Sequence, residues 1–108
     1  MIITVDKSIL RIIPCFYVIA LTMDVTVRDS EGMQDIISQY EQKIAEEYSL
    51  EEVLNIPLIK EARDGYKKFG KDPSRYRLAV ESLYRRIVKN NPLYRINNVV
   101  DAGNLLSL

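Results

Sequence analysis

Short polar side chains gather near the end of the chain, where they could line a pocket. The candidates are Asn97, Asn98, Asp101 and Asn104, which surround two valines in one segment. Amide and carboxylate groups of this kind hydrogen-bond the amide and hydroxyl groups of ligands. The same side chains are also suited to capping a helix and bracing the loop before it. Residue types alone favour this second use without excluding the first.

Positive charge is concentrated in the second half of the chain. Lysine plus arginine number 15, as do aspartate plus glutamate, so the formal net charge is +0. Residues 1–59, however, hold four basic and ten acidic residues, whereas residues 60–95 hold eleven basic and four acidic ones. A basic half with interleaved tyrosines has the composition needed for phosphate contacts and base stacking on RNA. The candidate RNA contacts are Lys67, Lys68, Lys71, Arg75, Arg85, Arg86, Lys89 and Arg95.

An ordinary solvated surface is the alternative for these basic residues. Arg77, Glu81 and Arg85 are spaced four residues apart, as in an ion-pair ladder along a helix. Charge alone favours this alternative, because most charge runs lie on solvated faces.

The tyrosines of the basic half divide into core and surface residues. Tyr76 and Tyr84 fall in the apolar register of a predicted helix, so we expect both in the core. Tyr94 follows a proline in a predicted loop, so we expect it to be exposed.

Residue types that are missing exclude several kinds of catalytic site. The sequence has no histidine, which excludes Ser-His-Asp and Cys-His sites and imidazole acid–base catalysis. The single cysteine, Cys15, permits no internal disulfide and no cysteine zinc site, which is consistent with a reducing compartment. Its apolar surroundings predict a small buried hydrophobe rather than a nucleophile. We therefore expect no metal and no cofactor.

The elements that position these residues begin with predicted strands. β-branched and aromatic residues dominate the first quarter of the chain, and these residue types favour strands. Pro14 interrupts the run, so we predict a short strand near Ile2–Val5 and a longer one near Phe16–Val27. The most apolar stretch is too short to span a membrane and resembles no secretory signal. We therefore expect a cytoplasmic protein with no membrane partner.

Helical spacing of apolar residues begins at Ser30 and predicts a helix of about four turns that reaches Tyr48. Ser49 and Glu52 form a capping-box pattern that predicts a short helical turn. Pro57 opens a further helix, for which Gly70 is the expected left-handed cap.

Asp72-Pro73 predicts the start of the next helix, and Asn90-Asn91-Pro92 predicts its end. The 108 residues, 47% of them hydrophobic, allow one domain over residues 1–108. The predicted fold class is α+β, with N-terminal strands followed by three to four helices.

Two stretches resemble a known family. Ile96-Asn97-Asn98-Val99-Val100-Asp101 with Asn104 resembles the I-N-N-V-V-D-x-x-N motif in the B3/B4 domain of the bacterial phenylalanyl-tRNA synthetase β subunit. Gly70, Asp72-Pro73-Ser74-Arg75-Tyr76-Arg77, Glu81, Leu83 and Arg85-Arg86 resemble the G-x-D-P-S-x-Y-R stretch and the following helix of stand-alone B3/B4-domain proteins. The resemblance is dense from Ala62 to Leu108.

That resemblance implies an α/β module that binds tRNA, with deacylation of mischarged tRNA in trans as one alternative. It implies that the asparagines and Asp101 lie near the family's pocket and that the arginines of the preceding helix contact RNA phosphates. The family's later G-x-P-x-x-x-x-D stretch, and the strands that carry a histidine and a glutamate, are absent from this sequence. We therefore expect an N-terminal portion of such a domain, or a homo-oligomer or partner that completes it, with little or no hydrolysis by the chain alone. The competing hypothesis is a protein-interaction module that dimerises through its apolar C-terminus and binds no RNA.

Overall fold

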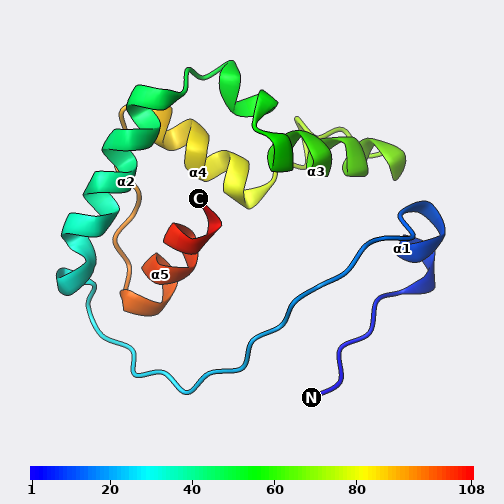
Figure 1. Ribbon diagram of the computed structural model, residues 1–108, viewed down its shortest axis with the longest axis horizontal. Coiled ribbons are helices and arrows are strands. Elements are labelled where there is room, and N and C mark those ends of the chain that lie inside the picture. The colour runs from blue at the N-terminus through cyan, green and yellow to red at the C-terminus, as the bar shows by residue number, and fades with distance from the viewer.

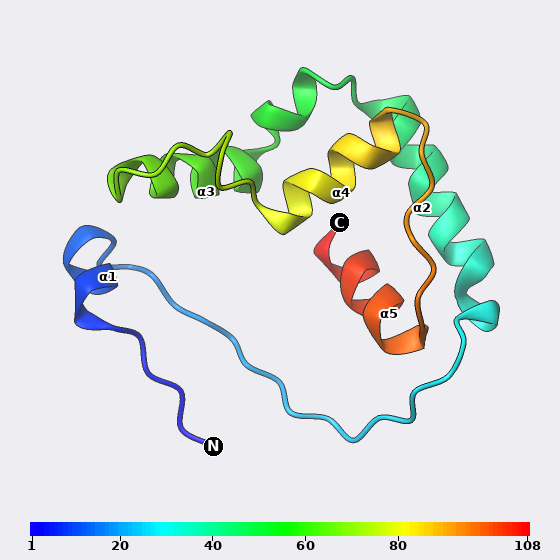
Figure 2. The same ribbon diagram turned by 180° about the vertical axis from the view of Figure 1, so that it is seen from behind.

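The computed structural model describes residues 1–108, and every regular element in it is a helix (Figures 1 and 2). In chain order the elements are α1 (Lys7–Ile12), η1 (Glu31–Met33), α2 (Gln34–Glu47), η2 (Glu52–Asn55), α3 (Pro57–Lys68), α4 (Ala79–Val88) and α5 (Asn98–Ser107), where η denotes a 3₁₀-helix. Helices cover 55% of the chain and no residue is in a strand. The predicted α+β fold is therefore wrong.

Neither predicted N-terminal strand forms. Asp6 instead begins α1, because its carboxylate accepts hydrogen bonds from the N–H and the hydroxyl of Ser8 at 2.8 and 2.6 Å. Residues 16–29, which we call the arm, run as a long trace along the edge of the molecule with no helix (Figure 1). Strand-forming residue types describe how side chains fit a sheet, and they do not supply the neighbouring strand that a sheet requires.

The core lies where α4 crosses α2 and η2, with α5 on its other side (Figure 1). Its buried apolar residues are Ile37, Ile44, Val53, Ile59, Tyr84, Ile87 and Leu93. The ring of Tyr84 packs edge-on against Tyr48 with 6.0 Å between the ring centroids, and its hydroxyl donates to the carbonyl of Leu108 at 2.5 Å. Burial raises the pKa of the Tyr84 phenol, with smaller contributions from Tyr48 and Glu47. Leu105 and Leu108 thus pack against the core.

Most of the predicted helices are confirmed. Helix α3 starts with Pro57 in its first turn, and Gly70 follows it with the expected left-handed φ of +71°. The capping pattern at Ser49 is also present, since its hydroxyl accepts from the N–H of Glu52 at 3.3 Å. The helix predicted from Asp72 is wrong in its start: a single turn forms there, and α4 begins only at Ala79.

The molecule is more extended than a compact domain of its size. Its radius of gyration is 16.1 Å, compared with about 13 Å expected for a globular chain of this length. The arm accounts for much of this, because it leads away from α2 and carries α1 to the free end of α3 (Figures 1 and 2). There, the side chain of Ile13 lies against Gly65.

A buried carboxylate joins α3, α4 and the loop between them. Glu81 on α4 is 0% exposed, and its Oε1 lies 2.6 Å from Nη1 of Arg63 on α3. The other oxygen, Oε2, lies 3.1 Å from Nε of Arg77 at the end of the loop, without an aligned hydrogen bond. A buried carboxylate requires such partners, because its desolvation is otherwise uncompensated.

Replacing Glu81 with Ala should destabilise the protein by about 3 kcal/mol, because two arginines lose their partner and a buried volume is emptied. Glu81→Gln should cost less, since an amide oxygen can still accept from Arg63. The measurement is urea unfolding followed by circular dichroism, with the exposed Glu51→Ala as the matched control. Equal unfolding midpoints for Glu81→Ala and Glu51→Ala would contradict this account of the contact.

Candidate RNA-binding surface

Exposed cations gather where α3 ends and the loop to α4 begins. We define the basic surface as Lys67 and Lys68 in the last turn of α3 together with Lys71 and Arg75 in the loop, all four of them exposed. The nearest acidic partner is Asp64, whose Oδ1 lies 3.9 Å from Nζ of Lys67, and both side chains are more than half exposed. An exposed pair at this distance has little effect on the charge that a ligand meets.

An aromatic ring stands within the basic surface. Tyr76 is 54% exposed, and Nζ of Lys71 lies 5.1 Å from the centroid of its ring. The prediction that Tyr76 is a core residue is wrong, because α4 starts after it and its helical register never forms. Tyr84, in contrast, is buried and Tyr94 is exposed, as predicted. The basic surface therefore combines free cations with a ring on which a base could stack.

Local geometry holds the loop in place. Gly70 turns the chain out of α3 in the left-handed region, and Oδ1 of Asp72 accepts from the N–H of Ser74 at 2.9 Å. The carbonyl of Asp72 also accepts from the N–H groups of Arg75 and Tyr76. The loop then reaches Arg77, which the Glu81 contact holds. These bonds leave the side chains of the basic surface pointing away from the core.

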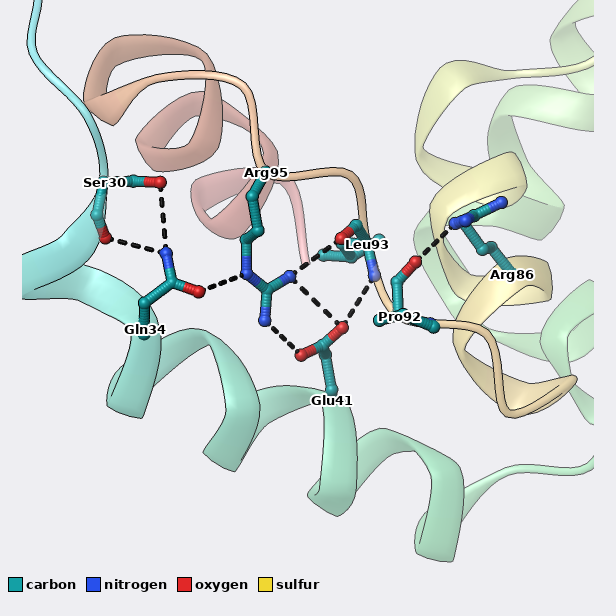
Figure 3. A network of polar contacts seen from close by, with 7 residues as sticks. All are labelled: Ser30, Gln34, Glu41, Arg86, Pro92, Leu93 and Arg95. Atoms are coloured by element: carbon teal, nitrogen blue, oxygen red, sulfur yellow. Dashed lines mark hydrogen bonds and ion pairs between the residues drawn. The ribbon is translucent and has the colours of Figure 1, made fainter.

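Arg95, predicted as an RNA contact, is half-buried in a polar network between α2 and the segment before α5 (Figure 3). Its Nη2 lies 2.7 Å from Oε1 of Glu41, and its Nε donates to Oε1 of Gln34 at 2.8 Å. Its Nη1 donates to the carbonyl of Leu93 at 2.9 Å, and the N–H of Leu93 donates back to Glu41 at 2.7 Å. The guanidinium thus fastens the segment before α5 onto α2.

The other predicted contacts on α4 lie apart from the basic surface. Nε of Arg86 donates to the carbonyl of Pro92 at 2.5 Å, and its guanidinium lies 3.9 Å from the ring centroid of Tyr94. Arg85 is half-buried, and its Nε is buried without a hydrogen-bond partner. Lys89 is exposed at the end of α4 that meets α2, opposite the end next to α3 (Figure 1).

The predicted polar pocket is made of side chains that mostly bond their own backbone. Asn97 caps α5 by accepting from the N–H of Val100 at 2.8 Å, and Oδ1 of Asp101 accepts from the N–H of Ile96 at 3.1 Å. The capping role that the residue types favoured is therefore confirmed for Asn97. Oδ2 of Asp101 is buried without a partner.

Asn98 connects α5 to the arm. Its side-chain oxygen accepts from the N–H of Arg28 at 2.8 Å, its side-chain nitrogen donates to the carbonyl of Thr26 at 3.0 Å, and its own N–H donates to the carbonyl of Arg28. Asn104 is half-buried. Ligand binding by these residues stays a prediction.

Two cavities lie elsewhere in the molecule. A groove of about 1060 Å³ between α1 and α3 is lined mostly by apolar side chains, together with Cys15 and with Lys68 and Lys71 of the basic surface. Because Cys15 is exposed there, its predicted burial is wrong. A shallow hollow of about 250 Å³ lies between α2 and the segment that follows α4. None of the four pocket candidates lines either one.

No protein family, curated protein or solved structure was found to match this chain. None of its helices combines the length and the apolar character that crossing a membrane requires.

The Glu41–Arg95 network should make stability depend on acid. Partial burial alone would raise the pKa of Glu41, but hydrogen bonds from Arg95 and Leu93 and the Arg95 charge outweigh it, so the pKa lies below the ordinary 4.5. Between the folded-state pKa of Glu41 and 4.5, the unfolded chain therefore binds more protons than the folded chain. The free energy of unfolding that Glu41 contributes is lost as pH falls through the folded-state pKa.

Accordingly, the urea midpoint should fall more steeply below about pH 5 for the wild-type chain than for Glu41→Gln. Glu46→Gln, at an exposed position on the same helix, should keep the wild-type pH dependence. The same pH dependence of the urea midpoint in the wild type and in Glu41→Gln would show that the Glu41 carboxylate does not stabilise the fold.

Proposed function

We propose that the chain binds tRNA through the basic surface. The proposal rests on the exposure of Lys67, Lys68, Lys71 and Arg75, which have a single weak acidic contact, and on the exposed ring of Tyr76 beside Lys71. Cations placed in this way neutralise phosphates and release their counterions, which is the main source of affinity for nucleic acids. An exposed tyrosine beside them suits an unpaired base.

The position of the acidic residues also favours this surface. The acidic first half includes α2, which lies on the opposite side of the molecule from the free end of α3 (Figure 1). A polyanion approaching the chain would therefore be repelled at one end and attracted at the other. Charge separation of this kind orients the ligand as well as binding it.

The resemblance to B3/B4 domains selects tRNA among nucleic acids. The stretch from Asp72 to Arg77, which resembles the family's D-P-S-x-Y-R motif, is the loop that carries Arg75 and Tyr76 of this surface. We propose binding rather than deacylation, because Asn97, Asn98 and Asp101 hydrogen-bond the backbone of their own chain.

Binding to tRNA should weaken steeply as salt rises, and the slope should report the basic surface. Replacing Lys67, Lys68 and Arg75 with Gln should lower affinity at about 50 mM salt by tenfold or more. The slope of log affinity against log salt should decrease by about two to three, roughly one for each lost phosphate contact. Fluorescence anisotropy of labelled tRNA over a salt series measures both.

The matched control replaces Arg28, Lys43 and Lys89 with Gln, which removes the same charge from exposed positions away from the basic surface. This control should bind within about twofold of the wild type. The proposal fails if the wild-type chain does not bind tRNA at low salt, or if both triple variants lose affinity equally, since net charge alone would then explain the binding.

A further inference from the structure

The arm presents an unpaired backbone. From Tyr17 to Val25 no N–H or C=O group makes a hydrogen bond within the chain. The two ends of the arm are held: the N–H of Phe16 donates to the carbonyl of Ile13, and Asn98 bonds the backbone of Thr26 and Arg28. Extended backbone with free donors and acceptors is a template for pairing with another extended segment.

Residues 16–20 of the arm are all hydrophobic, and from Leu21 to Arg28 apolar and polar side chains alternate. One row is apolar and 56–77% exposed, and it consists of Tyr17, Ile19, Leu21, Met23, Val25 and Val27. The opposite row, from Ala20 onward, consists of Ala20, Thr22, Asp24, Thr26 and Arg28. A period of two with one apolar side is typical of a segment that buries one face and pairs through its edge. Contiguous exposed apolar residues on this scale mark an interaction surface.

We propose that this face pairs with a second copy of the same chain, arm against arm and antiparallel about Ile19. The pairing is intermolecular, so each chain keeps its all-helical fold. It rests on observations separate from those that support tRNA binding, and neither proposal depends on the other.

Charge favours a second copy and selects the direction. The stretch from Ile12 to Met23 contains no charged residue, and it is flanked by Arg11 before and Asp24 after. Antiparallel pairing about Ile19 sets Tyr17 opposite Leu21, Val18 opposite Ala20 and Ile19 opposite itself, and it brings Asp24 of each copy to the turn at Pro14 of the other, near the end of α1 that carries Arg11. Parallel pairing would instead place like charges side by side at both ends. A two-fold axis repeats the favourable arrangement at both ends.

The groove between α1 and α3 gives the apolar row a place to be buried. A ribbon of two extended segments is marginal without a covering layer. Cys15 and Tyr17 line the groove together with Leu58 and Phe69 of α3 and its following turn. Antiparallel pairing about Ile19 brings Met23 and Leu21 of the second copy opposite Cys15 and Tyr17, at the mouth of this groove.

Light scattering at about 50 µM protein tests the dimer, with an expected mass of twice the 12.5 kDa of one chain. Ile19→Glu combined with Leu21→Glu should halve that mass and leave the helical circular dichroism unchanged, because both side chains are exposed in the single chain. Ile2→Glu combined with Leu106→Glu, at positions 91% and 83% exposed, is the matched control and should remain dimeric.

Monomeric wild-type protein at this concentration would overturn the proposal. So would a dimer that survives the arm substitutions, and loss of the dimer only in the control pair would place the interface at the termini instead.

Cysteine pairs test the register in a Cys15→Ser background. Under mild oxidation, mixed Tyr17→Cys and Leu21→Cys chains should cross-link more than either chain alone, because residues 17 and 21 face each other in the proposed register. The two copies of residue 17 would be about 13 Å apart, as would the two copies of residue 21, beyond the reach of a disulfide. Stronger cross-linking of each chain with itself than with the other would overturn the antiparallel arrangement.

Discussion

The organisation of this small protein depends on one buried carboxylate. Glu81 is fully buried with Arg63 of α3 and Arg77 at the end of the loop beside it, and these two ion pairs compensate the desolvation of its carboxylate. One buried side chain therefore joins α3, the end of the loop and α4. The cations between the two arginines are held outward, which gives the molecule its basic surface.

Sequence patterns predicted the helices well where burial was local. Pro57 at the start of α3 and the left-handed Gly70 act within a few residues, and the regular apolar spacing of α2 marks the face that packs against α4. The arm shows the limit: its residue types predicted a strand, but no neighbouring strand is present for it to pair with, so residues 16–29 form no regular element. The helix start predicted at Asp72 was wrong for a related reason. The Asp72 side chain caps a single turn, and no buried apolar face follows that would extend this turn into a helix.

The predicted RNA contacts differ in whether an acidic side chain lies beside them, and the local sequence does not reveal this difference. Arg95 meets Glu41, which lies 54 residues away in the sequence, whereas Lys68 and Arg75 meet no acidic side chain. A composition count treats these residues as equal. Only the packing of the segment before α5 onto α2 distinguishes a guanidinium that holds the fold together from one that remains free for a ligand.

The proposed tRNA site on the basic surface can be tested directly by nuclear magnetic resonance. The full-length chain labelled with ¹⁵N would be titrated with tRNA, and the amide signals followed residue by residue. We expect the amide signals from Lys67 to Arg77 to shift, and the signals of α2 to stay unchanged. Changes centred on α2 or on the arm, or a spectrum that does not respond to tRNA, would contradict it.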